Sequence, residues 1–143
     1  MTTSEQRAAV IAEALSWQGT PFVHAAMVKH IGVGCGAFMI ACYGSIGIPV
    51  PDNDKLGYFP HDWHQHECRE RYLEIISKFT HEVEAPLPGD IVMFRIGKVY
   101  GHSAIVIEWP QIIHVMWRRK VELADATKAP LDRRKTMFLS PFT

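Results

Sequence analysis

Residues 85–96 read APLPGDIVMFRI, and the spacing of the apolar residues changes within this stretch. Ahead of it, apolar side chains recur every three or four residues, which is typical of amphipathic helices. Beyond it, short runs rich in β-branched and aromatic residues are separated by turn residues, which is typical of strands. The prolines and the glycine of the stretch mark the break. Helices followed by strands predict an α+β fold, with an antiparallel sheet packed on the N-terminal helices.

Three helices are predicted ahead of the break. The first begins at a capping box formed by Thr3 and Gln6 and continues to Trp17. The second, residues 35–45, is apolar almost all round and should therefore be buried. The third lies within residues 62–79, and one side of it carries the larger apolar side chains: Tyr72, Leu73, Ile76 and Phe79.

Four strands are predicted beyond the break, each a short β-rich run between turn signals: 90–96, 102–108, 111–117 and 134–140. Residues 22–33 and 52–61 show no regular spacing and are expected to be irregular. Because no internal repeat or linker interrupts the chain of 143 residues, a single domain spanning residues 1–143 is predicted.

The charge balance and the first residues limit the class of protein. Fifteen basic residues balance fifteen acidic ones, which argues against a nucleic-acid binder, since such proteins carry a basic surface. The first ten residues, MTTSEQRAAV, do not have the basic stretch and long apolar segment of a signal peptide. No apolar run approaches the ~18 residues of a membrane span. We therefore expect a protein that is made in the cytosol without a signal peptide and has no membrane span.

Cys35 has a glycine on each side, in GVGCGAF (32–38), and opens the second predicted helix. A thiol at the first turn of a helix lies where the backbone N–H groups and the helix dipole favour an anion, which should lower its pKa below the usual ~8.5. Gly34 would allow a sharp turn, and Gly36 would let a substrate carbonyl approach. The alternative for any lone cysteine is a small buried apolar residue.

A hairpin is predicted between the second and third strands, because Glu-Trp-Pro at 108–110 interrupts two apolar runs. With a loop of those three residues, Ile107 would face Gln111 and Ala104 would face His114. This register places His114 on the same face of the sheet as the residue two positions before Ala104.

That residue is His102, one diagonal step from His114 and about 7–8 Å away between backbones. A nucleophilic thiol needs a base, and one imidazole could accept the proton of Cys35 while the other orients the first. The alternative for each histidine is a half-buried side chain with satisfied hydrogen bonds.

Three histidines and a cysteine lie at, or directly before, the start of the third predicted helix: His61, His64, His66 and Cys68. On a strand, alternate residues would line one face as metal ligands, but on a helix these positions point in widely different directions. No metal site is therefore predicted, and the histidines are interpreted as polar residues beside a substrate cleft or as helix-start surface. Cys42 and Cys68 are interpreted as residues of the core or the surface that have no chemical role.

An ordered set of motifs resembles the NlpC-type cell-wall peptidases: GTPF (19–22), GVGCGAF (32–38), PGDIVMF (88–94), GHSAIVI (101–107) and IIHV (112–115). These peptidases are papain-like cysteine hydrolases that cut the stem peptides of peptidoglycan. Two longer stretches, GTPFVHAAMVKHIGVGC (19–35) and PHDWHQHECRERYL (60–73), are most similar to the branch found in phage tails and tail-like particles. The resemblance spans nearly the whole chain and implies a papain-like α+β fold.

The resemblance also implies roles for individual residues. Cys35 would be the nucleophile, His102 the base and His114 the third residue, which orients His102. The substrate would be a peptidoglycan stem peptide, commonly cut between D-glutamate and a diamino acid, and no cofactor would be needed. A cell-wall enzyme without a signal peptide must be carried to its substrate. We therefore expect a phage-tail or tail-like-particle component with tail-tip or baseplate proteins as partners.

Four further positions would surround the oxyanion and the substrate: Phe22, Gly36, Gly101 and Ser103. Here the sequence departs from the family. The usual D-C-S-G is GCGA at 34–37, and the tyrosine that usually follows G-T-P and helps to bind the oxyanion is Phe22. Loss of one oxyanion donor can cost about 2.7–4 kcal/mol in the transition state. A structural tail-tip protein with a decayed site is thus one alternative, and a thiol amidase or acyltransferase that acts on other amides or lipids is another.

Overall fold

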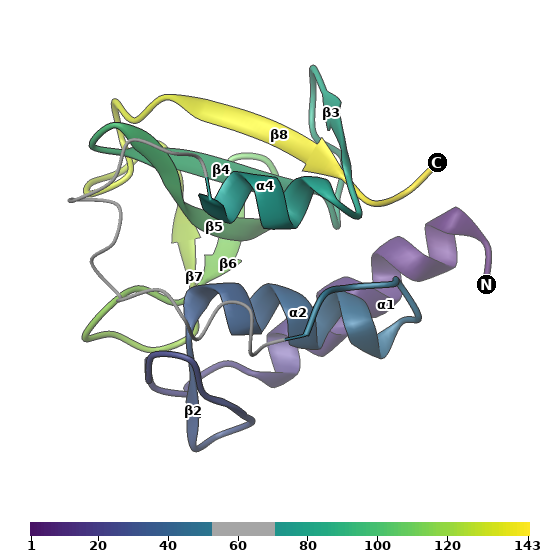
Figure 1. Ribbon diagram of the computed structural model, residues 1–143, viewed down its shortest axis with the longest axis horizontal. Helices are drawn as coiled ribbons and strands as arrows, with labels where there is room; N and C mark the ends of the chain where they lie inside the picture. The colour runs from purple at the N-terminus through teal and green to yellow at the C-terminus, as the bar shows by residue number, and fades with distance from the viewer. Residues whose placement is uncertain (53–70) are drawn as a thin grey trace.

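The computed structural model describes residues 1–52 and 71–143 of the chain (Figure 1). Its helices are α1 (Thr3–Ser16), α2 (Cys35–Ser45) and α4 (Arg71–Ser77). Two short strands, β1 (Met27–Val28) and β2 (Gly32–Val33), pair between α1 and α2. The remaining strands are β3 (His81–Val83), β4 (Ile91–Ile96), β5 (Val99–Glu108), β6 (Gln111–His114), β7 (Glu122–Asp125) and β8 (Thr136–Ser140).

The last six strands form one antiparallel sheet in the order β3-β8-β4-β5-β6-β7. α1 and α2 pack against each other, and both helices, together with α4, contact β5. In Figure 1, α1 and α2 lie on one side of the sheet, next to each other. The predicted arrangement of N-terminal helices on a C-terminal antiparallel sheet is therefore confirmed.

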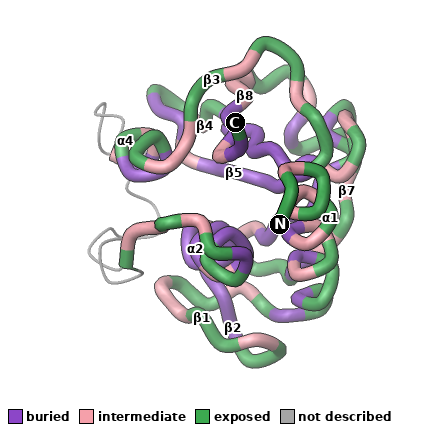
Figure 2. Tube along the Cα trace, turned by 90° about the vertical axis from the view of Figure 1, so that its right-hand side faces the viewer, coloured by how far each residue is buried: buried purple, intermediate pink, exposed green. Residues whose placement is uncertain are grey.

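The sheet is apolar on both faces, and each face belongs to a different cluster of buried residues. The face toward the helices includes Met93, Ile105 and Ile113, and it joins the buried side of α2 in the main core (Figure 2). The opposite face carries Val92, Phe94, Ala104, Val106 and Ile112, and is covered in part by Leu131. Alternate residues of each strand therefore belong to different cores, as the pleat requires.

A buried ion pair joins α1 to the start of β4. The carboxylate of Asp90 accepts hydrogen bonds from Arg7 Nη1 and from the Leu87 N–H, both at 2.8 Å, and Asp90 is 1% exposed. Gly89 has φ +91°, and a Cβ there would lie 3.2 Å from Arg7 Cα, so a side chain would be strained and crowded. The PGD segment is thus the point at which the first helix is fastened to the sheet.

The cap of α1 differs from the sequence prediction by one residue. Thr2 is the N-cap, with an extended backbone, and its Oγ1 accepts a hydrogen bond from the Glu5 N–H at 3.1 Å. The capping pattern is satisfied by Thr2 and Glu5 as well as by Thr3 and Gln6, so the sequence offers two overlapping boxes. The predicted Thr3–Gln6 box is wrong, and the helix begins at Thr3.

The bounds of α2 are those predicted, and α4 confirms the part of the third helix that lies within the described residues. The segment 22–33 was expected to be irregular but contains β1 and β2, and β3 and β7 are also additions to the prediction. Strands of two to four residues are too short for their apolar spacing to be recognised in sequence. His61, His64, His66 and Cys68 lie outside the described residues.

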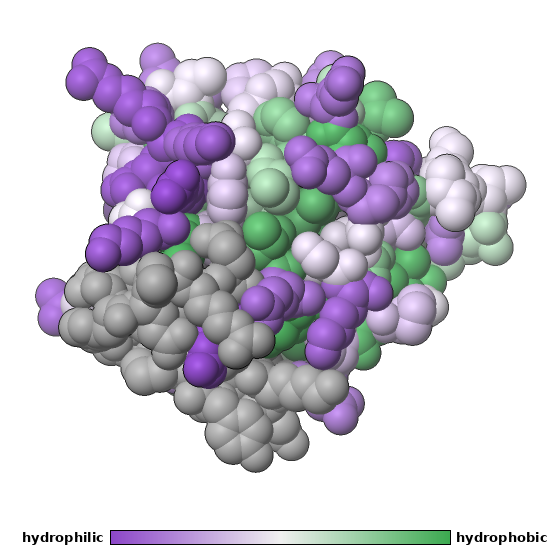
Figure 3. Space-filling view, turned by 45° about the horizontal axis from the view of Figure 1, so that its top comes forward, coloured by the Kyte–Doolittle hydropathy of each residue, from purple (hydrophilic) through white to green (hydrophobic). Residues whose placement is uncertain are grey.

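The surface carries both polar and apolar side chains. On the face shown in Figure 3, hydrophilic residues are interspersed with apolar ones. Several exposed apolar side chains belong to the segment around β1 and β2: Val23, Met27, Val28 and Ile31. Among the described helices, none is long and apolar enough to cross a membrane.

Candidate active site

Cys35 is the first residue of α2, and it is half-buried against the main core. Burial raises the pKa of its thiol to about 11, while hydrogen bonds from the backbone N–H groups of Gly36 and Cys35 act in the opposite direction. The two N–H groups are the anion-binding feature predicted from the helix start. Their effect is smaller than the loss of solvation of a buried thiolate. The predicted lowering of the Cys35 pKa is therefore wrong, and the resting thiol is protonated.

Gly34 precedes the helix for a reason other than the predicted sharp turn. Its φ of −84° and ψ of 164° are extended values that any residue adopts. A Cβ at Gly34 would instead lie 3.1 Å from the backbone nitrogen of Ala25. The absence of a side chain before the thiol thus allows the chain around Ala25 to pack closely against the start of α2.

His102 on β5 and His114 on β6 are in direct contact, as predicted. His102 Nε2 and His114 Nδ1 lie 2.8 Å apart, and the ring centroids lie 5.0 Å apart. The two side chains are 6% and 4% exposed. His102 also packs beside the ring of Phe94, with centroids 5.8 Å apart, on the face of the sheet opposite to the helices.

The register that brings the histidines together is partly the predicted one. Ile105 pairs with Ile113, which is the register expected when Ala104 faces His114. Nearer the turn, Glu108 rather than Ile107 pairs with Gln111, because the register shifts by one residue there. The irregularity leaves the register at the histidine end of the hairpin unchanged.

The hydrogen bond between the imidazoles limits their tautomers. If His102 Nε2–H donates to His114 Nδ1, then His102 Nδ1 keeps a lone pair and can act as a base. Burial lowers the pKa of His114 to about 4, Glu122 on the neighbouring strand acts against this effect, and Arg119 adds to it. His114 therefore stays neutral at pH 7 and can accept a hydrogen bond from a protonated His102.

Ser103 forms a hydrogen bond that the sequence did not predict. Its Oγ lies 2.5 Å from the hydroxyl of Tyr72 on α4, and both residues are buried. Burial and then the neighbouring Cys35 raise the pKa of Tyr72, which places the phenol within electrostatic range of the thiol. A tyrosine on the apolar side of a predicted helix indicates a buried hydroxyl that needs a partner, but the partner is distant in sequence.

The other predicted site residues lie close to these groups along the chain. Phe22 forms a bridge with Val33, two residues before Cys35, and packs against the main core. Gly36 is buried in the first turn of α2. Gly101 stands where the pairing of β4 with β5 shifts register, directly before His102.

The structure thus brings the predicted residues together in two groups. Cys35 packs against the main core, and Ser103 is hydrogen-bonded to Tyr72, which belongs to that core. His102 and His114 contact each other, and His102 packs beside Phe94, a residue of the second cluster. Adjacent residues of a strand point to opposite faces, and His102 is adjacent to Ser103 in β5. The contact between Cys35 and His102 that a triad requires stays a prediction.

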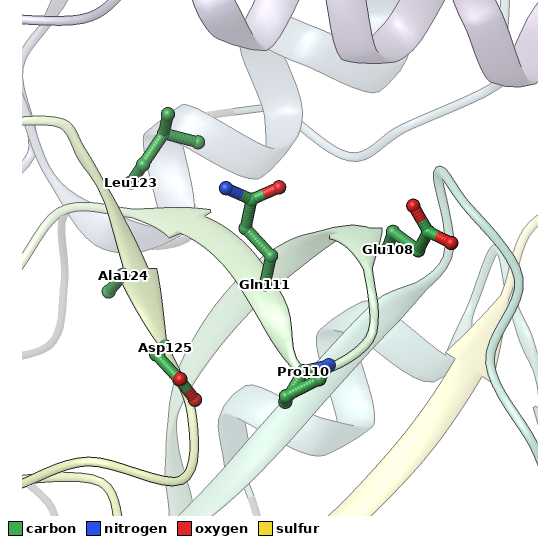
Figure 4. A pocket seen from close by; sticks show the side chains of 6 residues that line it. All are labelled: Glu108, Pro110, Gln111, Leu123, Ala124 and Asp125. Atoms are coloured by element: carbon green, nitrogen blue, oxygen red, sulfur yellow. The ribbon is translucent and has the colours of Figure 1, made fainter.

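A surface pocket of about 330 Å³ lies elsewhere, between the loop of the β5–β6 hairpin and β7 (Figure 4). Six residues line it: Glu108, Pro110, Gln111, Leu123, Ala124 and Asp125. This lining includes none of the predicted site residues. Among the described residues, no group of three His, Cys, Asp or Glu side chains is arranged to hold a metal ion.

Comparison with known proteins identifies the family of this chain. A family model described as the NlpC/P60 family matches residues 19–139, from shortly after α1 into β8. The chain belongs to the NlpC/P60 family. The matched segment of this NlpC/P60 domain contains every residue predicted for the site. The comparison with curated proteins found no match.

Solved structures share the fold of this NlpC/P60 chain at low sequence identity. The NlpC/p60 domain of the peptidoglycan hydrolase SagA is 18% identical, with a TM-score of 0.62 over 94% of this chain and 97% of that chain. A Staphylococcus aureus protein of the NLP/P60 family, similar to a lipoprotein, is 18% identical, with a TM-score of 0.71 over 100% of this chain and 43% of that chain.

RipD from Mycobacterium tuberculosis, a non-catalytic NlpC/p60 domain protein adapted to peptidoglycan binding, is also similar. It is 16% identical, with a TM-score of 0.59 over 94% of this chain and 95% of that chain. Identities this low show the fold alone, and that fold is the predicted papain-like α+β arrangement. The same fold therefore occurs both in a hydrolase and in a non-catalytic protein.

Proposed function

We propose that this NlpC/P60 protein is a cysteine peptidase that cleaves an amide bond in peptidoglycan stem peptides. The observation that carries the proposal is the buried hydrogen bond between His102 and His114. Two imidazoles taken out of water and joined at 2.8 Å form a base with a fixed orientation. Cys35 at the start of α2 would supply the nucleophile.

Because burial raises the pKa of Cys35 to about 11, the thiol would not ionise on its own at pH 7. His102 Nδ1 would take the thiol proton as the sulfur attacks the amide carbonyl, and the hydrogen bond to His114 would stabilise the imidazolium. His102 would then protonate the leaving amine, which breaks the C–N bond and leaves a thioester on Cys35. His102 would next take a proton from water as the water oxygen attacks the thioester carbonyl. The C–S bond then breaks, the carboxylic acid leaves, and His102 returns the proton to the sulfur.

We propose as the scissile bond the one between D-glutamate and a diamino acid, on the resemblance of the motifs around Cys35 and His102. We also propose delivery by a phage tail or tail-like particle, supported by the resemblance of residues 19–35 and 60–73 to proteins of that branch. Detection of the protein in purified tail particles by immunogold labelling would test the delivery. Its absence from particles that contain the other tail proteins would contradict it.

The activity is tested by incubating the purified protein with purified sacculi and identifying the released fragments by mass spectrometry. The expected products carry a new amino terminus on the diamino acid, and Cys35→Ser should release none while keeping the wild-type fold. His102→Ala should be similarly inactive. Release of the same fragments by Cys35→Ser would exclude the thiol mechanism.

A non-catalytic tail-tip or peptidoglycan-binding protein is the second candidate. Phe22, Gly34 and Gly36 replace residues that the family uses around the thiol, and RipD is a non-catalytic member of the family. This alternative predicts that wild type and Cys35→Ser sediment equally with sacculi and that neither releases fragments.

A further inference from the structure

The buried hydroxyl pair of Tyr72 and Ser103 has one hydrogen more than its mutual hydrogen bond uses. Each hydroxyl carries one hydrogen, and the bond at 2.5 Å consumes one of the two. The second hydrogen needs an acceptor, because an unpaired donor in an apolar environment costs about 1–3 kcal/mol. Among the described residues, no other hydrogen-bond partner of either hydroxyl is present.

The position of the pair indicates where that acceptor would be. Tyr72 is 3% exposed and belongs to the main core, and Cys35 packs against the same core. Ser103 directly follows His102 in β5. Burial raises the pKa of Tyr72, and Cys35 is the next cause, yet no hydrogen bond joins these two described residues. The phenol therefore belongs to the core that Cys35 packs against, within electrostatic range of the sulfur and not hydrogen-bonded to it.

We propose that Tyr72 is a catalytic residue whose hydroxyl, held by Ser103, donates a hydrogen bond to the oxyanion formed when Cys35 attacks the substrate carbonyl. In such an adduct the carbonyl carbon is bonded to the sulfur, and the negative oxygen is attached to that carbon. A donor near the sulfur but not bonded to it suits this oxygen. The inference rests on the proposed function only for its substrate, a stem peptide. The addition of Cys35 to a carbonyl does not require that substrate.

The direction of the two hydrogen bonds follows from acidity. A phenol is more acidic than an alcohol and is the stronger donor, so it belongs on the charged acceptor. Ser103 then donates to the Tyr72 oxygen, which leaves the phenol hydrogen for the oxyanion. This assignment supplies an oxyanion donor from α4 in a chain that has Phe22 where the family has a tyrosine.

The experiment compares Tyr72→Phe with a matched control, Tyr43→Phe. Tyr43 is also fully buried, and its hydroxyl donates to the Gly89 carbonyl at 2.6 Å in the core. Both variants lose one buried hydroxyl and both should lose stability. Only Tyr72→Phe should lower kcat on a stem peptide, by about 100-fold with little change in KM, because the bond to the oxyanion forms in the transition state. Ser103→Ala should cause a smaller loss.

A peptide aldehyde separates this inference from the proposed function. The Cys35 thiol passes its proton to His102 and adds to the aldehyde: the S–C bond forms as the carbonyl π bond breaks, and the new oxygen mimics the oxyanion. Tyr72→Phe should weaken aldehyde binding, while the rate of alkylation by iodoacetamide, which forms no oxyanion, should stay unchanged.

Equal aldehyde affinity in wild type and Tyr72→Phe would overturn the inference, whether or not stem peptides are cleaved. An equal slowing of alkylation and loss of aldehyde affinity would also overturn it, since the tyrosine would then act on the thiol. A wild type that cleaves no stem peptide but loses aldehyde affinity on Tyr72→Phe would refute the proposed substrate and support the role of Tyr72.

Discussion

Replacement of His114 by glutamine should make folding stability less sensitive to acid. In the folded protein, burial lowers the pKa of His114 from 6.5 to about 4, against the opposing effect of Glu122. In the unfolded chain the imidazole is in water and titrates near 6.5. Glutamine has a similar size, can still hydrogen-bond to His102, and does not titrate.

The sign and the size follow from the difference in bound protons. Between pH 6.5 and pH 4 the unfolded chain binds a proton that the folded protein does not, so the free energy of unfolding falls as the pH falls. The stability that the folded protein gains from this difference at His114 is fully present above pH 6.5 and is lost as the pH falls toward 4. For a pKa of 6.5 in the unfolded chain and about 4 in the folded protein, the free energy of unfolding falls by about 2.5 kcal/mol between pH 7 and pH 4.5.

Urea unfolding, followed by the fluorescence of the four tryptophans, measures this difference. Carboxylates titrate in both proteins and cancel in the comparison, so wild type should lose about 2.5 kcal/mol more than His114→Gln between pH 7 and pH 4.5. Parallel losses in the two proteins would refute the reasoning. A midpoint near 6.5 for the His114 ring in an NMR titration of the folded protein would do so independently.

Three other predictions concern the thiol, the oxyanion and the link between α1 and the sheet. In His102→Ala, which lacks the base, the alkylation rate of Cys35 should keep rising with pH toward about 11, and a plateau below pH 9 would contradict the raised pKa. Phe22→Tyr should speed acylation of a stem peptide more in a Tyr72→Phe background than in wild type, because only the Tyr72→Phe protein lacks a phenol donor. Equal effects in the two backgrounds would argue against the oxyanion as the acceptor of both phenols. Asp90→Ala should lower the free energy of unfolding by about 3 kcal/mol in urea titrations, because it breaks a buried ion pair, and a loss below about 1 kcal/mol would show that Arg7 contributes little there.

The bounds of α2 and the contact between His102 and His114 could be predicted because they depend on local pattern. For α2, glycines lie at both ends of an apolar stretch. For the histidines, a turn joins two β-rich stretches in which alternate residues point to the same face. Where two patterns overlap, as at Thr2 and Thr3, the sequence does not decide between them.

The pKa of Cys35 could not be predicted, because it is a balance between burial and two backbone N–H groups. The sequence shows the helix start but not how much solvent the fold removes from the sulfur. The reason for Gly34 was likewise not visible, since it depends on the packing of Ala25 against it. The Tyr72–Ser103 bond joins two elements separated by the part of the chain where the spacing changes, so local patterning carries no signal for it.

The hairpin that joins His102 to His114 also has a consequence for biosynthesis. Its strands are consecutive in the chain, so the imidazole pair can form from one short, late segment, whereas Cys35 belongs to a helix translated much earlier. While the ribosome is still adding the second half of the protein, the nascent chain displays a thiol that has no base. The chemistry that we propose can begin only after β6 has emerged and paired with β5. An unfinished product that lacks β6 would therefore be inert in this chemistry.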